Sequence, residues 1–220
     1  MKIENRVYIC DVRALGEGDK FSDWYEKMPE YRREKIDKMK PEGGKRLSLG
    51  AGILFCEGLK SYGLDPQDVK IELGENEKPF ISDTGLSFNL SHSKDVAVGA
   101  FSEKEVGIDV EKVKEFKKTL VEYVFDESEI NAVKEEAGSD LDLENSLYTK
   151  LWTMKESLMK YCGKGISMSP KKIVISENSV SYEGKKLENI TFTHFEYGDY
   201  HISVCSEDKN FCSSMEEIEI

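Results

Sequence analysis

The sequence lacks several features that would assign it to a class of protein at once. Its longest apolar run lies near residues 49–55 and is far too short to cross a membrane, and residues 1–11 have no signal-like apolar core. The five cysteines form no C-x-x-C pair and are odd in number, which argues against a disulfide framework and against a cysteine zinc site. We therefore expect a cytoplasmic protein that does not interact with membranes.

Positive charge is also scarce, because 31 Lys and Arg residues stand against 43 Asp and Glu residues, a formal net charge of −12 at pH 7. Nucleic-acid binding is driven by clustered Lys and Arg, so this balance argues against nucleic acid as the main partner. Residues 32–46 are an exception, with seven basic and three acidic side chains. A solvated helix face is the common explanation for such a run.

Two carboxylates stand at the end of a strand-like segment in residues 88–111. In residues 106–111, VGIDVE, apolar side chains alternate with others, which is the period of a half-buried strand. Asp109 and Glu111 therefore point to the same face. Adjacent carboxylates repel each other unless a cation or a basic side chain compensates, and such oxygen ligands suit Mg²⁺. The alternative is a solvated strand face, which is the more common origin of a D-x-E pair.

A third carboxylate lies in residues 145–161, whose apolar side chains recur at helical spacing and which end before Gly163. Glu156 and Lys160 are four residues apart and so share one face of the predicted helix. They could form an ordinary exposed ion pair worth roughly 0.2–0.5 kcal/mol. They could instead provide a third metal ligand and a phosphate-binding ammonium.

Three segments, FNLSHS, VGIDVEK and LWTMKESLMKYCGKGIS, occur in this order between residues 88 and 167. They resemble the signature of the 4′-phosphopantetheinyl transferases, in particular the monomeric Sfp-type class. The pattern of that family is a Ser-His pair, then G-[IV]-D-[IV]-E, then W-x-x-K-E-[SA]-x-x-K. The resemblance is anchored over residues 88–167 and extends more weakly to the rest of the chain.

The resemblance implies transfer of the 4′-phosphopantetheine group of coenzyme A to a serine of an apo acyl or peptidyl carrier protein, with release of 3′,5′-ADP. It implies Mg²⁺ as the metal, with Mn²⁺ as an alternative ion. Asp109, Glu111 and Glu156 would hold the metal. The coenzyme A phosphates would be bound by Ser91, His92 and Lys160, of which His92 and Lys160 would also stabilise charge on the leaving phosphate.

Three further assignments have an alternative explanation. Lys78-Pro79 matches part of a Gly-Lys-Pro motif of the family, but Glu77 replaces the glycine, so Lys78 is either a coenzyme A contact or an ordinary turn lysine. Residues 32–46 would contact the 3′-phosphate and adenine end of coenzyme A, without an assignment of single residues. Glu129 is a candidate general base by resemblance, although its spacing from Asp126 is that of a helix capping box.

Weak internal repetition indicates two similar halves. Residues 47–63 resemble residues 151–165, Lys70-Ile71 resembles Lys172-Ile173, and residues 97–103 resemble residues 201–207, at offsets of 104, 102 and 104 residues. We expect an α/β (α+β) fold with halves at residues 1–104 and 105–220, related by a pseudo-two-fold axis. The active site would lie in the cleft between them, where pockets are preferentially found, so a monomer could build it.

Strands are expected at residues 6–12, 69–73, 79–81, 86–90 and 106–111, with Ser91 and His92 in the following turn, and helices at residues 47–62, 116–124, 126–137 and 145–161. An apolar stripe in residues 116–124 is either core or a docking surface for the carrier protein. The acidic tail, residues 215–220, is expected to be frayed.

Two other functions fit the same residues. One is a non-catalytic relative that binds coenzyme A or a carrier protein, against which the presence of all three carboxylates and Lys160 argues. The other is a metal-dependent nucleotide pyrophosphohydrolase, which would use water as the nucleophile. The requirement for a carrier protein distinguishes these functions from the transferase.

Overall fold

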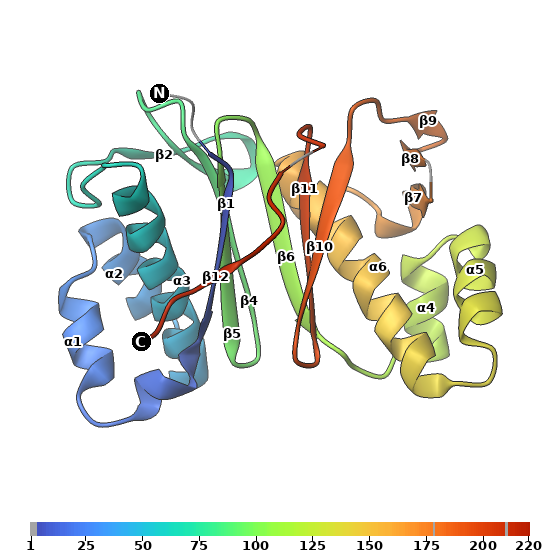
Figure 1. The fold of residues 1–220 in the computed structure, drawn as a ribbon, viewed down its shortest axis with the longest axis horizontal. Coiled ribbons are helices and arrows are strands. Elements are labelled where there is room, and N and C mark those ends of the chain that lie inside the picture. Colours follow the sequence, from blue (N-terminus) through green and yellow to red (C-terminus); the bar gives the residue numbers. More distant parts are fainter. Residues whose placement is uncertain (1–3, 178, 210) are drawn as a thin grey trace.

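The strands of the two larger sheets form a central layer with helices on both sides (Figure 1). The structure is a computed structural model and describes residues 4–177, 179–209 and 211–220, so residues 1–3 of the segment tested for a signal sequence lie outside the description. Among the described residues, no helix is both long and apolar enough to cross a membrane.

The chain up to residue 104 contains three helices and five strands in the described residues. These are β1 (Arg6–Asp11), α1 (Lys20–Glu26), α2 (Glu30–Asp37), α3 (Glu42–Ser61), β2 (Ile71–Leu73), β3 (Pro79–Ile81), β4 (Ser87–Ser93) and β5 (Val96–Ser102). The remaining elements are β6 (Val106–Lys112), α4 (Lys118–Val124), α5 (Glu127–Ala137), α6 (Leu141–Tyr161), β7 (Ile173–Ser176), β8 (Ser179–Tyr182), β9 (Lys185–Lys186), β10 (Thr191–Tyr197), β11 (Tyr200–Ser206) and β12 (Glu216–Glu217). Short 3₁₀ helices occupy Val12–Gly16, Glu75–Glu77, Gly165–Ser167 and Pro170–Lys172.

The central layer consists of two sheets. One has the strand order β12-β1-β5-β4 and the other has the order β10-β11-β6, while β2-β3 and β7-β8-β9 form small separate sheets. The pairs β1–β5, β4–β5, β10–β11 and β11–β6 are antiparallel, and β12 runs parallel to β1. Helices α1, α2 and α3 lie on one side of the molecule and α4, α5 and α6 on the other (Figure 1).

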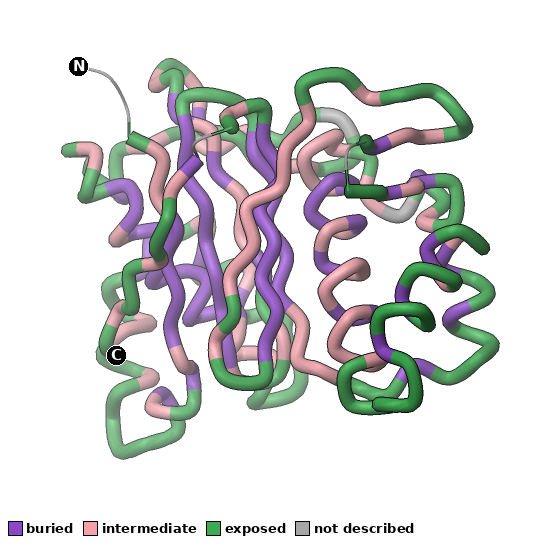
Figure 2. Tube along the Cα trace, turned by 45° about the vertical axis from the view of Figure 1, so that its right-hand side comes forward, coloured by how far each residue is buried: buried purple, intermediate pink, exposed green. Residues whose placement is uncertain are grey.

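The alternation of β1 explains how the first sheet is buried on both faces. Tyr8 and Cys10 belong to a core that contains residues of α3, whereas Val7 and Ile9 belong to a core that contains residues of β6 and β11. The central strands are accordingly buried along most of their length (Figure 2). The two sheets therefore share one apolar core across the boundary between the predicted halves.

The mixed α+β fold class is confirmed. The predicted strands and helices occur, but their ends are shifted. Helix α3 begins at Glu42 rather than at residue 47, and α6 begins at Leu141 rather than at residue 145, with Asp140 as its N-cap. In each predicted half, a helix packs against a hairpin. Helix α3 packs against the β4–β5 hairpin, and α6 packs against strand β11 of the β10–β11 hairpin (Figure 1). The boundary at residue 104 and the pseudo-two-fold relation stay predictions.

Two expectations were wrong. Ser91 and His92 lie within β4, paired with Val98 and Ala97 of β5, because the hairpin continues for three residues beyond the predicted end of the strand. The acidic tail is not frayed, because Glu216 and Glu217 pair with β1. Ile218 and Ile220 also pack against the first core, which ties down the end of the chain.

Candidate active site

The site lies at the seam where β4 of the first sheet faces β6 of the second. The seam is joined by side chains of β4 that alternate along the strand. Ser91 Oγ donates a hydrogen bond to Asp109 Oδ1 at 2.8 Å, and Ser93 Oγ donates one to Glu111 Oε2 at 2.9 Å. Asn89 Oδ1 accepts a hydrogen bond from the backbone N–H of Ile108 at 2.9 Å. Both predicted metal-binding carboxylates of β6 are thus held by serines of β4.

Lys160 of α6 reaches the same seam. Its Nζ donates hydrogen bonds to Asp109 Oδ1 at 2.7 Å and to Ser91 Oγ at 2.8 Å. In the described part of the chain, Lys160 forms no ion pair with Glu156, so the simple helical pair that the spacing allowed is absent. The lysine instead binds across the seam to β6 and β4.

Gly107 permits this close approach of α6 to β6. A Cβ atom at residue 107 would lie 2.1 Å from the carbonyl oxygen of Ser157 and 2.4 Å from the backbone nitrogen of Tyr161. Real Cβ atoms do not come so close to backbone, and backbone of a helix cannot move aside as a side chain can. The glycine of the V-G-I-D-V-E segment therefore sets the distance between the helix of Lys160 and the strand of Asp109.

Asp109 is only 5% exposed, and its Oδ2 has no hydrogen-bond partner among the described residues. Burial raises the pKa of this carboxyl group, while the charge and hydrogen bond of Lys160 and the hydrogen bond of Ser91 act in the opposite direction. A buried carboxylate oxygen without a partner is costly. The residue lines the pocket described below, so this oxygen is a candidate metal ligand.

Glu156 is half-buried and forms no hydrogen bond or ion pair with the described residues. Burial raises the pKa of its carboxyl group, and the charges of Asp109 and Glu111 raise it further. Glu111 is bound by Ser93 and by Lys114 Nζ at 3.2 Å. A hard divalent cation would compensate the repulsion that Asp109 and Glu111 exert on Glu156, so the chemistry of the three carboxylates suits such an ion. Their ligand atoms do not all lie within 4.8 Å of one another, so the structure does not bring the three into a closed set of ligands.

A pocket of about 440 Å³ opens beside this seam. Its wall combines α2 and α3 of the first half with β6 and α6 of the second, so both predicted halves contribute to it. The residues of the pocket that bear on its chemistry are Tyr31, Arg32, Lys35, Ser48, Ser91, His92, Asp109, Glu111 and Lys160. Basic side chains thus face acidic ones across a single cavity.

Arg32 is the most buried cation of the pocket wall. Its Nη2 donates to the backbone carbonyl of Ser48 at 2.6 Å, and its Nε has no hydrogen-bond partner among the described residues. Burial lowers the pKa of Arg32. The sequence marked residues 32–46 as unusually basic but did not single out Arg32 or Lys35, which the fold alone brings to the pocket.

His92 is exposed at the mouth of the pocket. Partial desolvation by the pocket wall, followed by the charge of Lys160, lowers the pKa of the imidazole below its ordinary value of 6.5. This shift favours the neutral form of the side chain. Lys78, in contrast, does not line this pocket, because its Nζ binds the Glu105 carboxylate and the carbonyl oxygens of Val106 at 3.2 Å and Tyr161 at 3.3 Å.

Glu129 also lies outside the pocket, in a buried ion pair. Its Oε2 accepts hydrogen bonds from Lys155 Nζ at 2.6 Å and from the backbone N–H of Asp126 at 2.9 Å. Its Oε1 accepts one from the backbone N–H of Ile175 at 2.9 Å. The predicted capping box with Asp126 is present. Every hydrogen bond of Glu129 is thus made to the scaffold of α5, α6 and β7.

Lys155 was not singled out by sequence reasoning, although it precedes Glu156 in the W-T-M-K-E segment. Its side chain is fully buried, and Nζ also contacts the carbonyl oxygens of Val124, Pro170 and Ile173 at 3.1, 3.0 and 2.7 Å. Helical spacing alone could have placed Lys155 on the face opposite the site. The partners of Lys155 lie in other segments of the chain, so they could be identified only from the fold.

Comparisons with known proteins agree on one family. The family model described as the 4′-phosphopantetheinyl transferase superfamily matches residues 105–205. A 4′-phosphopantetheinyl transferase of Bacillus subtilis is 28% identical over 220 residues, which cover 96% of this chain and 94% of that protein.

Two further relatives reach higher identity. The 4′-phosphopantetheinyl transferase Sfp of Bacillus subtilis (strain 168) is 31% identical over 164 residues, 74% of this chain and 70% of that protein. The 4′-phosphopantetheinyl transferase gsp of Aneurinibacillus migulanus is 33% identical over 165 residues, 73% of this chain and 68% of that protein. The chain therefore belongs to the 4′-phosphopantetheinyl transferase superfamily, a family of transferase enzymes.

Proposed function

We propose that this protein transfers the 4′-phosphopantetheine group of coenzyme A to a serine hydroxyl of an apo carrier protein and releases 3′,5′-ADP. The observation that carries the proposal is the pocket whose wall includes both the Asp109–Lys160 ion pair at the seam and the cations of α2. The chain's family membership supports the same reaction.

The basic wall suits the nucleotide end of coenzyme A. Arg32 and Lys35 line the pocket of a protein with a net charge of −12, so they concentrate positive charge where the rest of the surface repels anions. The guanidinium of Arg32 places a positive charge at the pocket wall, where a phosphate group would bind. Because both walls come from one chain, we propose that the protein acts as a monomer.

Asp109, Glu111 and Glu156 would hold Mg²⁺ or Mn²⁺, which supplies charge compensation for the pyrophosphate when it is bound. The unpartnered Oδ2 of Asp109 and the unpaired carboxylate of Glu156 support this assignment. Ser91 and Ser93 would keep the carboxylates of β6 oriented, since each donates to one of them.

Lys160 and His92 would act on the leaving phosphate. Lys160 lies at the pocket with a fixed position because two acceptors hold its ammonium group, so it can stabilise developing negative charge without reorganisation. His92 stands at the mouth of the pocket and, in its neutral form, can donate one hydrogen bond to a phosphate oxygen. Positioning and electrostatic stabilisation are the main contributions that a protein makes to phosphoryl transfer.

The proton of the carrier serine needs an acceptor at the pocket. Glu129 was the sequence-based candidate, but its buried ion pair with Lys155 favours the alternative role as a helix cap. Lys78 likewise binds backbone carbonyls near the seam, which favours a structural role over a coenzyme A contact. We propose that both residues support the site without touching the substrates.

Intact-mass spectrometry tests the proposal. An apo carrier protein incubated with this protein, coenzyme A and Mg²⁺ should gain the mass of one phosphopantetheine group, and EDTA should prevent the gain. Asp109→Ala should abolish the transfer, since the variant loses both a metal ligand and the partner of Lys160. The matched control is Glu135→Gln, which changes an exposed carboxylate of α5 and should transfer normally.

Other outcomes would replace the proposal. Coenzyme A binding without mass gain on carriers of fatty acid, polyketide and nonribosomal peptide synthesis would favour the non-catalytic relative. Metal-dependent cleavage of coenzyme A in the absence of any carrier would favour the pyrophosphohydrolase. A folded Asp109→Ala variant with normal turnover would refute the metal assignment.

A further inference from the structure

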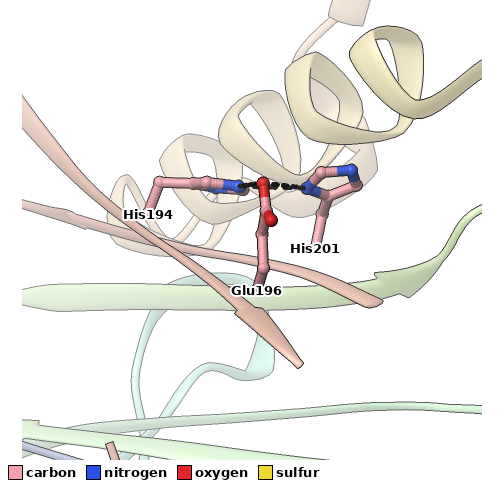
Figure 3. A group of neighbouring side chains, drawn as sticks. All are labelled: His194, Glu196 and His201. Atoms are coloured by element: carbon pink, nitrogen blue, oxygen red, sulfur yellow. Dashed lines mark hydrogen bonds and ion pairs between the residues drawn. The ribbon is translucent and has the colours of Figure 1, made fainter. Parts of the chain in front are cut away.

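Two histidines and a glutamate come together on the β10–β11 hairpin (Figure 3), and none of the three lines the pocket. His194 Nε2 lies 3.0 Å from His201 Nδ1. Glu196 Oε1 lies 4.0 Å from His194 Nε2 and 3.9 Å from His201 Nδ1. Among the described residues, this is the one group of three or more such side chains whose ligand atoms all lie within 4.8 Å of one another.

The antiparallel register explains why the three side chains meet. Glu196 of β10 is paired with His201 of β11, and His194 is paired with Ser203. Directly paired residues of an antiparallel sheet point to the same face, so all four side chains lie on one face. It is the face covered by α6, because Ser146 and Thr153 of α6 bind His201 and Ser203.

The hydrogen bonds around His194 define its protonation. Thr153 Oγ1 donates to the carbonyl oxygen of Lys150 at 2.8 Å, so it can only accept from Ser203 Oγ, which is 2.8 Å away. Ser203 Oγ has then used its proton and accepts from Nδ1 of His194 at 3.2 Å. The proton of His194 is therefore on Nδ1, and Nε2 presents a lone pair to the cluster.

The second ring nitrogen of each histidine faces a serine hydroxyl. His194 Nδ1 contacts Ser203 Oγ, and His201 Nε2 contacts Ser146 Oγ at 2.7 Å. Metal-binding imidazoles generally make such a bond with the nitrogen that does not bind the metal, because it sets the tautomer and the orientation of the ring. Each of the two facing nitrogens therefore belongs to a ring whose other nitrogen is hydrogen-bonded to a serine.

Burial keeps both imidazoles neutral, as metal binding requires. Desolvation, followed by the charge of Lys150, lowers the pKa of His194 to about 3. Desolvation also lowers the pKa of His201. Glu196 is 69% exposed and leaves one side of the cluster open to solvent, and its negative charge offsets the nearby Lys150.

We propose that His194 Nε2, His201 Nδ1 and the Glu196 carboxylate bind a divalent transition metal of the zinc class, with a further position open to water. The separations of 3.0–4.0 Å bracket the ligand–ligand distance of about 3.3 Å that follows from tetrahedral zinc with bonds of about 2.0–2.1 Å. On binding, the proton of His201 moves from Nδ1 to Nε2, which then donates to Ser146, so no proton is lost.

The proposed site differs in chemistry from the carboxylates at the pocket. Imidazole nitrogens select zinc, copper, nickel and cobalt, whereas a set of oxygen ligands suits magnesium. The two sites are nevertheless neighbours, because His201 is paired across strands with Glu111, and Ser203 with Asp109. Excess Mg²⁺ should therefore fill the pocket site without displacing zinc from the hairpin.

Equilibrium dialysis of the chelator-treated full-length protein against Zn²⁺, in excess Mg²⁺, tests the proposal. The wild-type chain and Asp109→Ala should each bind one Zn²⁺ that Mg²⁺ does not displace. Glu196→Gln should weaken Zn²⁺ binding at least ~10-fold, and Ser146→Ala by roughly 10–100-fold, the usual effect of losing a hydrogen bond behind a metal ligand. Glu135→Gln is the matched control and should leave zinc binding unchanged.

Co²⁺ provides a second measurement through its visible absorption, which is intense in four- or five-coordinate nitrogen sites. Wild type and Asp109→Ala should show the band, and Glu196→Gln should show it weakened. Because Glu196 is exposed, this variant is expected to fold even where a histidine variant does not. Absence of zinc binding in wild type, or binding lost in Asp109→Ala and unchanged in Glu196→Gln, would overturn the proposal and leave a hydrogen-bonded histidine pair.

Discussion

At the scale of single residues, two lysines of one helix have opposite roles. Lys160 is part-exposed at the pocket and binds Asp109, whereas Lys155 is fully buried and binds Glu129. Both pairs have short N–O distances, so distance alone does not tell them apart. The difference is access: one ammonium group faces a cavity and the other is enclosed by backbone carbonyls.

The buried pair leads to a prediction about stability. Glu129→Gln leaves the ammonium of Lys155 buried without a counter-charge, which should lower the free energy of unfolding by about 3–5 kcal/mol. Urea denaturation followed by circular dichroism measures this change. If Glu129 were instead the general base, the variant would keep its stability and lose only turnover. A double variant, Lys155→Met with Glu129→Gln, should recover part of the stability because no buried charge remains.

A second residue-scale prediction concerns Lys160. Lys160→Met keeps the length of the side chain but removes the ammonium, so transfer to a carrier protein should fall at least ~10²-fold, in the range observed for removing one stabilising donor from a transition state. Intact-mass kinetics measure the rate. Lys114→Met is the control, because it removes another cation that pairs with a carboxylate of β6 but does not line the pocket. Equal losses in both variants would contradict a specific role for Lys160.

At the scale of elements, the distance between α6 and β6 decides the geometry of the site. Periodicity predicted both elements and the faces they present. It did not reveal that their backbones touch at Gly107, because contact between segments fifty residues apart is not a local property. Similarly, alternation placed Asp109 and Glu111 on one face, but only the packing of β4 against β6 provided Ser91 and Ser93.

Gly107→Ala should push α6 away from β6. The added methyl group cannot be accommodated without moving helix backbone, so the free energy of unfolding should drop by at least about 1–3 kcal/mol, the usual cost of overpacking. Transfer activity should fall as well, because Lys160 would lose contact with Asp109. Thermal unfolding and the carrier assay measure the two effects. Gly43→Ala is the control, since a Cβ atom there meets nothing within 4 Å.

In the whole molecule, the C-terminal segment adds an edge strand to the first sheet and covers part of its core. The strand β12 pairs with β1, and the last isoleucines pack on the core that α3 covers (Figure 1). A short acidic tail without periodicity is ordinarily frayed, and this tail is ordered by a partner strand more than two hundred residues earlier. Tertiary contacts therefore decide whether such a tail is ordered or frayed.

Removal of residues 215–220 should therefore destabilise the protein, by about 1–3 kcal/mol from the lost burial of Ile218 and Ile220. Chemical denaturation of the truncated and full-length chains measures the difference. Glu219→Gln is the control, because it preserves both the strand pairing and the apolar contacts. Equal stability of the truncated chain would contradict a structural role for the tail.

Periodicity, charge and motif spacing are local properties, so the sequence alone predicts the class of elements, the acidic character and the resemblance to a family, and through that resemblance it proposes three carboxylates and Lys160 as site residues. Which of these groups meet depends on the tertiary structure. It brought Arg32 to the pocket wall, enclosed Glu129 with Lys155, and assembled His194, Glu196 and His201 on one face of a hairpin. Ion pairing, desolvation and metal binding depend on distances between segments that the chain separates by tens of residues, and such distances are not encoded locally.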